Sequence, residues 1–231
     1  METKFKVAVL IPAHNEEAAI GKLIKDLQGK VNRVIVVNDG STDSTAKEAE
    51  NKGAVVLHHR KRRGKGEALK TGFNYILENE YQAVITMDGD GQHLPSEIHK
   101  FIETFEKSPD NIGLIIGFRR RELGRMPLDR LLTNWFTSAV VSFFSHQRIS
   151  DSQCGFRLIR REALKGIKLL TSHFDTESEI LVKIARKGFR ILSIPIKTVY
   201  QEEKSKISPF VDTLRFFKFV FNIAFSKKPH K

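Results

Sequence analysis

Ala83-Val84-Ile85-Thr86-Met87-Asp88-Gly89-Asp90-Gly91-Gln92-His93 sets an apolar run directly before two aspartates that are one residue apart. Such a run, followed by glycines and polar residues, predicts a buried β-strand over residues 83–87 and then a turn. Ligands of parallel sheets bind beyond the carboxyl ends of the strands, so in such a sheet both aspartates lie where the chemistry takes place. The segments on either side decide whether the sheet is of this kind.

These flanking segments repeat the alternation of apolar runs and helical patterns. Further strands are predicted at residues 7–12, 33–38, 54–58 and 112–117. Helices are predicted between them, at residues 17–27, 42–52, 65–78 and 95–106. Strands that are apolar along nearly their whole length are buried on both faces. The chain is therefore predicted to be of the α/β class, with a mainly parallel central sheet and helices on both faces.

The second half of the chain opens with a long amphipathic helix. Residues 127–145 place Leu, Trp, Phe and Val at helical spacing, with Thr, Asn and Ser on the other side. Beyond it we expect a strand within 152–159, a helix at 177–187, a strand at 190–196 and a second amphipathic helix at 208–226. No linker rich in Gly, Pro or Ser divides the sequence, so residues 1–231 are expected to form one domain.

Composition and charge restrict the partners and the compartment. A chain of 231 residues that is 40% hydrophobic and 29% charged fits a single α/β core. The net charge of +12 predicts an anionic partner, which is nucleic acid, anionic lipid or a phosphorylated substrate. The single cysteine, Cys154, favours a reducing, cytoplasmic compartment. No apolar stretch approaches the ~20 residues that span a bilayer, so the chain is expected to lie on a membrane at most.

The paired aspartates favour a divalent cation. Hard carboxylate oxygens suit Mg²⁺ or Mn²⁺, which keeps positions open for the phosphate oxygens of a substrate. The intervening glycines let the backbone approach a diphosphate closely. An ordinary Asp-Gly turn between a strand and a helix is the competing explanation.

A second acidic turn, Asn38-Asp39-Gly40-Ser41-Thr42-Asp43, follows the strand at 33–38. Asp43 or Ser41 is expected to cap the next helix. Asp39 is left over, one position beyond the strand. Its carboxylate is expected to accept hydrogen bonds from a nucleotide base or ribose, and a purely structural role is the alternative.

A basic segment, Arg60-Lys61-Arg62-Arg63-Gly64-Lys65-Gly66, opens the helix predicted at 65–78. It is either a solvated charge run or a phosphate site in which Lys65 and backbone amides freed by glycine act together. The glycine-rich phosphate loop that ends in Gly-Lys-Ser or Gly-Lys-Thr is missing from the sequence, and so is Gly-x-Gly-x-x-Gly after the first strand. These absences argue against kinases, GTPases and nicotinamide-dependent enzymes.

Taken in order, four motifs resemble the family 2 glycosyltransferases of GT-A fold, and most closely the dolichyl-phosphate mannose and glucose synthases. They are Ile11–Glu17, Val37–Asp43, Gly64–Gly66 and Asp88–His93. Asp151–Arg157 looks like the Asp-x-x-x-Gly-Phe segment of those enzymes, and Lys204–Ser208 looks like their C-terminal basic motif. The resemblance therefore covers nearly the whole chain and implies a Rossmann-like nucleotide-diphospho-sugar transferase fold.

The resemblance also implies roles for individual residues. The donor nucleotide would be bound by Pro12, Ala13, Asn15, Glu16, Asp39, Lys65, Gly66, Asp88 and Gly89. Asp88, Asp90 and Arg119 would be catalytic, and Asp90 with Gln92 would ligate the Mg²⁺ or Mn²⁺ that bridges the diphosphate. The acceptor phosphate would be bound by Arg119, Arg130, Asn134 and Lys206. Residues 1–118 would form the nucleotide-sugar half and residues 119–231 the acceptor half.

The implied activity is an inverting, metal-dependent transfer of a hexose from UDP-glucose or GDP-mannose to a polyprenyl or dolichyl phosphate. His14 stands where the family commonly has tyrosine, and Glu202 falls near an arginine of some mannose synthases, so the nucleotide and the sugar stay open. A phosphate monoester has a second pKa near ~6, so this acceptor needs scarcely any general base.

The chain is expected to act at an anionic membrane surface, on the cytoplasmic side. The helix at 127–145 either packs its apolar face on the sheet or docks it in the lipid interface.

Other functions explain less of the sequence. A family 2 enzyme with a glycan or small-molecule acceptor is the nearest alternative. A nucleotidyltransferase would place a glycine-rich loop with Lys or Arg right after the first strand, where Pro12-Ala13-His14-Asn15-Glu16 stands. A nucleic-acid-binding protein would explain the charge of +12 but gives Asp39, Asp88 and Asp90 no role, so no nucleic-acid partner is expected.

Overall fold

A computed structural model describes residues 5–119, 128–172 and 175–197, with the side chains of residues 128–132 left out of the description. The described residues form one seven-stranded sheet in the order β3-β2-β1-β4-β6-β5-β7. The strands are β1 (Val7–Ala13), β2 (Arg33–Asp39), β3 (Val55–His59), β4 (Ala83–Thr86), β5 (Ile112–Arg119), β6 (Arg157–Arg160) and β7 (Arg190–Ile196). The α/β class and the mainly parallel sheet predicted from the sequence are confirmed.

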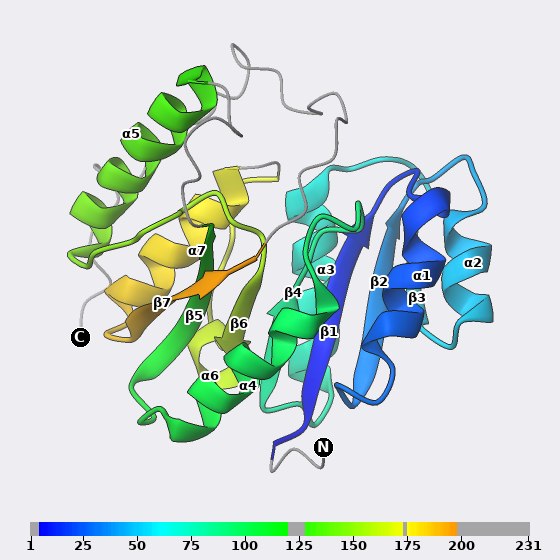
Figure 1. Cartoon of the computed structure of the whole chain (residues 1–231), viewed down its shortest axis with the longest axis horizontal. Helices are drawn as coiled ribbons and strands as arrows, with labels where there is room; N and C mark the ends of the chain where they lie inside the picture. Colours follow the sequence, from blue (N-terminus) through cyan, green and yellow to red (C-terminus); the bar gives the residue numbers. More distant parts are fainter. Residues whose placement is uncertain (1–4, 120–127, 173–174, 198–231) are drawn as a thin grey trace.

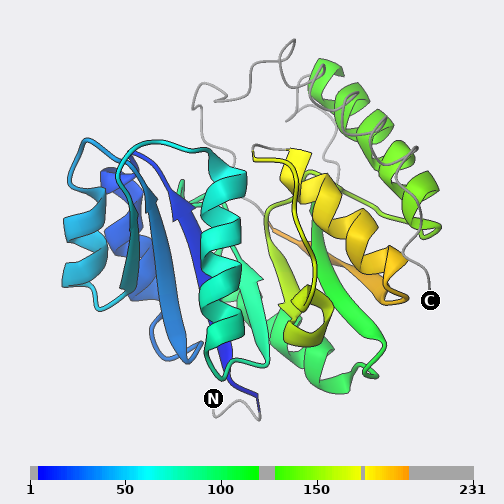
Figure 2. The same ribbon diagram turned by 180° about the vertical axis from the view of Figure 1, so that it is seen from behind.

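Helices connect these strands in the predicted order, and the short helix α6 is an addition that was not predicted. They are α1 (Glu17–Leu27), α2 (Thr45–Asn51), α3 (Lys65–Glu78), the 3₁₀ turn η1 (Pro95–Glu97), α4 (Ile98–Lys107), α5 (Leu128–Ser145), α6 (Arg161–Leu164) and α7 (Asp175–Arg186). Figure 1 shows α1 and α4 in front of the sheet, and Figure 2 shows α3 and α7 on the opposite face. Helices therefore cover both faces, as expected, while α5 lies on the flank, beside α7.

Parallel pairing brings the carboxyl ends of the first strands to one edge. β1 pairs with β2 and with β4 in parallel, so that Leu10 is opposite both Ile35 and Thr86. β3 extends this half, with His59 opposite Asp39. The strand predicted within 152–159 forms as β6, which runs antiparallel between β4 and β5. The segment before β6 consequently returns to the edge at which β4 ends.

The core fills the space between the sheet and its helices. Residues 7–11 of β1 and 83–85 of β4 are fully buried. Phe101 and Phe105 of α4 are buried as well, between this helix and the sheet (Figure 1). A strand buried on both faces is apolar along its length, which is the pattern that revealed these strands in the sequence.

Helix α2 begins three residues later than predicted, at Thr45. The carboxylate of Asp43 accepts a hydrogen bond from the Thr45 amide at 3.0 Å, so one of the two residues expected to cap this helix does serve its first turn. The turn at residues 40–44 is drawn instead toward the tip of β1. There the Asn15 carboxamide accepts the amide hydrogen of Thr42 at 2.9 Å, with Asn15 itself in the left-handed region at φ 55°.

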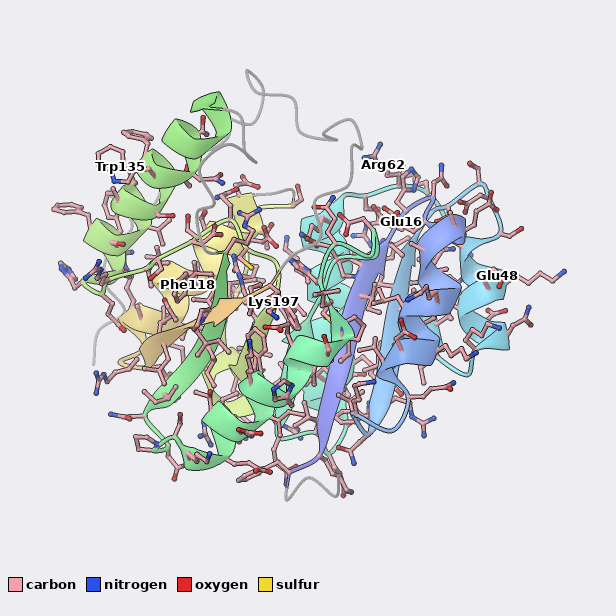
Figure 3. The ribbon with its side chains drawn as sticks, viewed as in Figure 1. Glu16, Glu48, Arg62, Phe118, Trp135 and Lys197 are labelled. Atoms are coloured by element: carbon pink, nitrogen blue, oxygen red, sulfur yellow. The ribbon has the colours of Figure 1, made fainter. Side chains whose placement is uncertain are left out.

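Helix α5 forms where the apolar pattern predicted it, but its small polar side chains face inward. Thr137, Ser138 and Ser145 are buried, whereas Trp135, Phe136 and Phe143 are 57%, 45% and 72% exposed. The Ser138 hydroxyl contacts the amide and hydroxyl of Ser152 at 3.0 and 3.2 Å. Figure 3 shows Trp135 pointing away from the body of the molecule. Packing of the whole apolar face on the sheet, one of the two expectations, is therefore wrong for these three side chains.

Candidate active site

The turn after β4 holds the two aspartates beside each other. The Asp88 amide donates to Nδ1 of His93 at 3.3 Å, and the Gln92 amide donates to Oδ1 of Asp90 at 3.0 Å. Gly91 has φ 75°, a conformation that an L side chain rarely adopts, so glycine is needed at this position. Asp88, Asp90 and Gln92 are half-buried, while His93 is buried against Phe156.

Lys65 links Asp88 to the start of α7. Its ammonium group forms an ion pair with Asp88 and a second one with Glu177, at 2.9 Å. Lys65 is the first residue of α3, and Glu177 lies in the first turn of α7. Burial by itself lowers the pKa of Lys65, but the charges of Asp88 and Glu177 outweigh it and raise this pKa above its ordinary value. Lys65 is therefore held as a cation between two carboxylates.

The two aspartates differ in charge balance. Burial raises the pKa of Asp88, but the ammonium of Lys65 outweighs it and lowers this pKa to about 2. The pKa of Asp90 is raised by burial and then by the negative charge of Asp88. Within the described residues no cationic side chain forms an ion pair with Asp90. A half-buried carboxylate that repels its neighbour and lacks such a partner is a place where an added cation is stabilised.

These residues fit a divalent cation that is shared with a ligand. Asp90 and Gln92 provide oxygen ligands, and Asp88 adds charge next to them. Within the described part of the chain, no group of three or more His, Cys, Asp or Glu side chains gathers closely enough to hold a metal. A cation bound here would thus draw its remaining ligands from phosphate oxygens or water, as Mg²⁺ usually does.

The segment 151–157 packs directly on Asp88. A Cβ added to Gly155 would lie 2.8 Å from Oδ2 of Asp88, so only glycine lets the backbone come this close. Arg119, at the end of β5, donates from Nε and Nη2 to the two carboxylate oxygens of Asp151 at 2.8 and 3.1 Å. This bidentate pair fixes Arg119 beside the segment that closes over Asp88.

Asp39 is buried and bound to the chain itself. Its carboxylate accepts hydrogen bonds from His59 Nδ1 at 2.7 Å and from the amides of Arg63 and Gly64 at 2.8 and 2.7 Å. These contacts give Asp39 a structural role, whether or not it also binds a ligand. Its contact with a nucleoside stays a prediction.

The backbone amides of the basic segment are turned inward. Those of Arg63 and Gly64 bind Asp39, and the amide of Gly66 donates to the Ser172 carbonyl at 3.0 Å. Gly66 also touches the first turn of α7, because an added Cβ would lie 2.1 Å from Oγ1 of Thr176. Contact between phosphate and these three amides is thus blocked, which leaves Lys65 and the exposed arginines for it.

The end of β1 supplies the other predicted donor-binding residues. Pro12 and Ala13 end the strand, and Asn15 and Glu16 follow it. A Cβ added to Gly89 would lie 3.3 Å from Cγ of Glu16, so the tip of β1 touches the turn after β4. Figure 3 shows Glu16 and Arg62 at the same edge of the molecule. The predicted donor residues therefore gather at one edge, around Asp88 and Asp39.

The predicted acceptor residues are only partly described. Arg119 lies at the site, and Asn134 lies on α5, one helical turn before Ser138, which contacts the 151–157 segment. Arg130 belongs to α5, but its side chain is outside the described residues, as is the whole of Lys206. The structure thus binds Arg119 to this segment and places Asn134 one turn away from the contact of α5 with it, and the acceptor roles of all four residues stay predictions.

Three residues of this site had no role from the sequence alone. Glu177 forms an ion pair with Lys65, and Asp151 orients Arg119. His93 accepts a hydrogen bond from the Asp88 amide. His93 and Asp151 stood inside motifs that had already been singled out. Glu177 lies in the acidic run Asp175-Thr176-Glu177-Ser178-Glu179, whose position at a helix start is an ordinary preference of acidic side chains.

Comparison with known proteins shows the family and the fold to which this chain is similar. The profile described as Glycosyl transferase family 2 matches residues 8–168. UDP-N-acetylglucosamine–dolichyl-phosphate N-acetylglucosaminyltransferase of Methanococcus voltae is 30% identical over 85% of this chain and 86% of its own. Undecaprenyl-phosphate mannosyltransferase of Micrococcus luteus is 30% identical over 88% of each chain. Glucosyl-3-phosphoglycerate synthase of M. tuberculosis has a similar fold, with a TM-score of 0.73 at 20% identity over 95% of this chain and 81% of its own.

Proposed function

This chain belongs to glycosyl transferase family 2 and is a glycosyltransferase, and from this premise we propose that it moves a hexose from a nucleotide sugar to a polyprenyl phosphate. The donor is UDP-glucose or GDP-mannose, and the transfer inverts the anomeric carbon. The names of the relatives from Methanococcus voltae and Micrococcus luteus, both of which act on lipid-linked phosphates, support this acceptor class. The same two names carry different sugars and therefore leave the sugar open.

The observation that carries the proposal is the pair Asp88 and Asp90 at the end of β4, with a charge that its surroundings only partly neutralise. Breaking the bond between sugar and phosphate leaves a nucleoside diphosphate with additional negative charge. Mg²⁺ or Mn²⁺, held by Asp90 and Gln92 beside Asp88, would offset this charge. Both aspartates are half-buried, and partial exclusion of water strengthens such electrostatic stabilisation.

Lys65 supplies a second positive charge to the donor. It is held by Asp88 and Glu177, within reach of the turn that carries both aspartates. A cation held by Asp90 and Gln92 beside Asp88 would compete with Lys65 for the charge of Asp88, and the Lys65 ammonium would then be available to a phosphate oxygen. Because the amides around Lys65 are engaged by the chain, its side chain is the part of the basic segment best placed for this contact.

The acceptor phosphate would be bound at Arg119 and along α5. Arg119 already has a carboxylate partner in Asp151, so its guanidinium is fixed in direction before any ligand arrives. A phosphate monoester with a second pKa near ~6 is largely ionised at neutral pH. It attacks the anomeric carbon without a general base, and no carboxylate outside the metal site needs to accept a proton.

The exposed apolar face of α5 supports action at a membrane surface. Trp135, Phe136 and Phe143 are exposed on a helix that contacts the 151–157 segment with its other side. Aromatic side chains on one side of a surface helix are typical of helices that lie in the lipid interface. No helix in the described part of the chain is long and apolar enough to cross a membrane. We propose that α5 docks in the interface and holds the lipid-linked acceptor near Arg119.

A transfer assay tests this function. The full chain is incubated with Mn²⁺, a polyprenyl phosphate and labelled UDP-glucose or GDP-mannose, and label is measured in the organic phase. We expect one donor to yield a lipid-linked product of inverted anomeric configuration. Label transferred only to water, glycans or small molecules would contradict the proposed acceptor. Steeply salt-dependent binding of DNA or RNA with no transfer would favour a nucleic-acid-binding protein instead.

A further inference from the structure

His59 is a buried histidine at the end of β3 to which the reaction gives no direct role. It is 8% exposed and lies opposite Asp39 in the parallel pairing of β2 and β3. Its Nδ1 is 2.7 Å from Oδ1 of Asp39, and its Nε2 is 2.9 Å from Oγ1 of Thr71. An ionised carboxylate only accepts hydrogen bonds, so Nδ1 carries the proton in this pair. Both ring nitrogens are therefore used inside the protein.

Asp39 transmits this contact to the basic segment. Besides His59, its carboxylate binds the amides of Arg63 and Gly64, the last two residues before α3. Gly40 adds a close backbone contact on the same side. A Cβ at this glycine, which has φ 65°, would lie 2.5 Å from the Arg62 nitrogen. The segment before α3 is thus pressed onto the turn after β2 and bound to it by charge-assisted hydrogen bonds.

The same histidine holds α3 at a second point. Thr71 lies on α3, seven residues after Gly64. Asp39 therefore binds the residue before the helix, and His59 binds a position about two turns along it. Lys65 follows Gly64 directly and begins the helix. The hydrogen bonds of His59 and Asp39 to α3 and to the residue before it therefore set where the side chain of Lys65 lies relative to Asp88 and Glu177.

We propose that His59 is a positioning residue for donor binding, which fixes Lys65 and the exposed Arg62 and Arg63 at the edge of the sheet through Asp39 and Thr71. The ligand that this arrangement serves is the diphosphate of a nucleotide sugar. The proposal rests on the function proposed above, and it adds a residue that touches neither the donor nor the metal. A positive charge that is held in place before binding loses less conformational entropy on meeting a phosphate.

Variants of His59 and its neighbours separate positioning from ordinary packing. H59A removes both contacts, and H59N keeps an N–H donor near the Nδ1 position for Asp39. T71V removes the second contact with little change in shape. H58A is the matched control, because His58 is the preceding residue of β3 and its exposed ring pairs with Glu50. Calorimetry with Mn²⁺ and UDP or GDP gives the dissociation constant, and the transfer assay gives kcat and both KM values.

H59A is expected to weaken nucleotide binding about tenfold and to raise the donor KM by a similar factor. Its kcat and acceptor KM should stay within about twofold of wild type. H59N is expected to recover most of the loss, and H58A to match wild type. A role in folding alone would lower kcat through inactive protein and leave the donor KM unchanged, and that result would overturn the proposal. Equal weakening in H58A would overturn it too.

If H59A does not fold, T71V decides the question. It is expected to weaken nucleotide binding about threefold, and binding equal to wild type would count against the proposal. Wild-type protein that binds UDP or GDP with Mn²⁺ but transfers no sugar would refute the proposed function and leave this inference standing. Wild-type transfer together with unchanged donor KM in H59A and T71V would refute the inference alone.

Discussion

Asp90 is the single side chain on which the proposed metal site depends most. Its pKa is raised by burial and by the neighbouring Asp88, and within the described residues no cationic side chain pairs with it. Asp90→Asn removes the charge with little change in shape. We expect at least about a hundredfold loss in the Mn²⁺-dependent rate of transfer, because even residues outside the first ligand sphere typically contribute ten- to a hundredfold.

The rate is measured as a function of Mn²⁺ concentration in both proteins. Asp110→Asn is the matched control, since Asp110 is an exposed aspartate that pairs with Arg160. Arg160 lies opposite Ala83, the first residue of β4, and therefore at the end of this strand away from Asp90. A D90N enzyme with the same Mn²⁺ dependence as wild type would contradict the metal site.

Asp39 gives a prediction about pH. Burial alone would raise its pKa, but hydrogen bonds from His59 and from the amides of Arg63 and Gly64 outweigh this and hold the pKa below the ordinary value of 3.8. Because the folded-state pKa is the lower one, the ionised carboxylate stabilises the fold above about pH 4. That contribution is lost as the pH falls from 3.8 toward the folded-state pKa.

Asp39→Asn is therefore expected to lower the free energy of unfolding by about 2 kcal/mol near pH 7, and by clearly less near pH 3. Urea unfolding of both proteins across this pH range measures the difference. A loss of stability that is the same at both ends would mean that the charge of Asp39 is not what holds the segment before α3.

The ion pair of Glu177 with Lys65 could not be predicted from the sequence. Three segments could be predicted as parts of the site because each combines glycine with charge after a strand. They are the turn at 88–93 after β4, the acidic turn after β2 and the basic segment. Glu177 has no such marking, and its partner Lys65 is more than a hundred positions away. Long-range ion pairs of this kind follow from how α3 and α7 are packed, so only the folded chain reveals them.

The exposed aromatic side chains of helix α5 give a testable prediction about membrane binding. Trp135→Ser and Phe143→Ser remove exposed apolar side chains from a helix whose polar side is already packed. If α5 docks in a lipid interface, each change removes about 1.5–3 kcal/mol of burial and weakens binding to anionic liposomes by about tenfold or more.

Flotation with liposomes at low salt measures this binding. Leu170→Ser serves as the control, because Leu170 is 75% exposed but lies outside α5. Liposome binding that is unchanged in both α5 variants would contradict membrane docking. It would point instead to another occupant of this face, such as a second copy of the chain or a part of it beyond the described residues.

Arg157 ties β6 to α7 from inside the core. It is 1% exposed, and its guanidinium donates to the carbonyl oxygens of Cys154, Ser152 and Glu177 at 2.7, 2.8 and 2.7 Å. Lysine keeps the charge but cannot reach three carbonyls in these directions. Arg157→Lys is expected to cost about 3 kcal/mol of unfolding free energy, since buried acceptors lose their donors.

Arg190→Lys, at an exposed position of β7, should change stability by no more than about 0.5 kcal/mol. Denaturant unfolding of both variants compares them. Equal stability of R157K and wild type would show that the three carbonyl contacts contribute nothing net.

The spacing of apolar residues predicted where the strands and helices lie, but not how each of them packs. All seven strands of the described residues were expected from the sequence, although β6 was placed only somewhere within 152–159, and helical spacing located α5 to within a residue or two. The spacing did not reveal which side of α5 faces the protein, because that depends on Ser152 and the other groups it meets. The late start of α2 has a similar cause, since Asn15 draws the Ser41–Thr42 turn toward β1.

At the scale of the whole molecule, the parallel strands explain why motifs far apart in the sequence form one site. β1, β2 and β4 end at the same edge, and β6 returns the 151–157 segment to it. Asp39 ends β2 and Asp88 lies in the turn after β4, yet two consecutive residues, Gly64 and Lys65, bind one each. The net charge of +12 fits a donor diphosphate, an acceptor phosphate and an anionic surface met along this edge.

If a divalent cation at Asp88 and Asp90 binds the diphosphate of a sugar donor, the donor should stabilise the fold only together with the metal. Thermal unfolding with UDP-glucose or GDP-mannose, with and without Mn²⁺, measures this dependence. One donor at about a hundred times its dissociation constant should stabilise the fold by about 2.7 kcal/mol, which raises Tm by about 5–10 °C. We expect this shift only when Mn²⁺ is present. A shift of equal size without metal, or none with either donor, would contradict it.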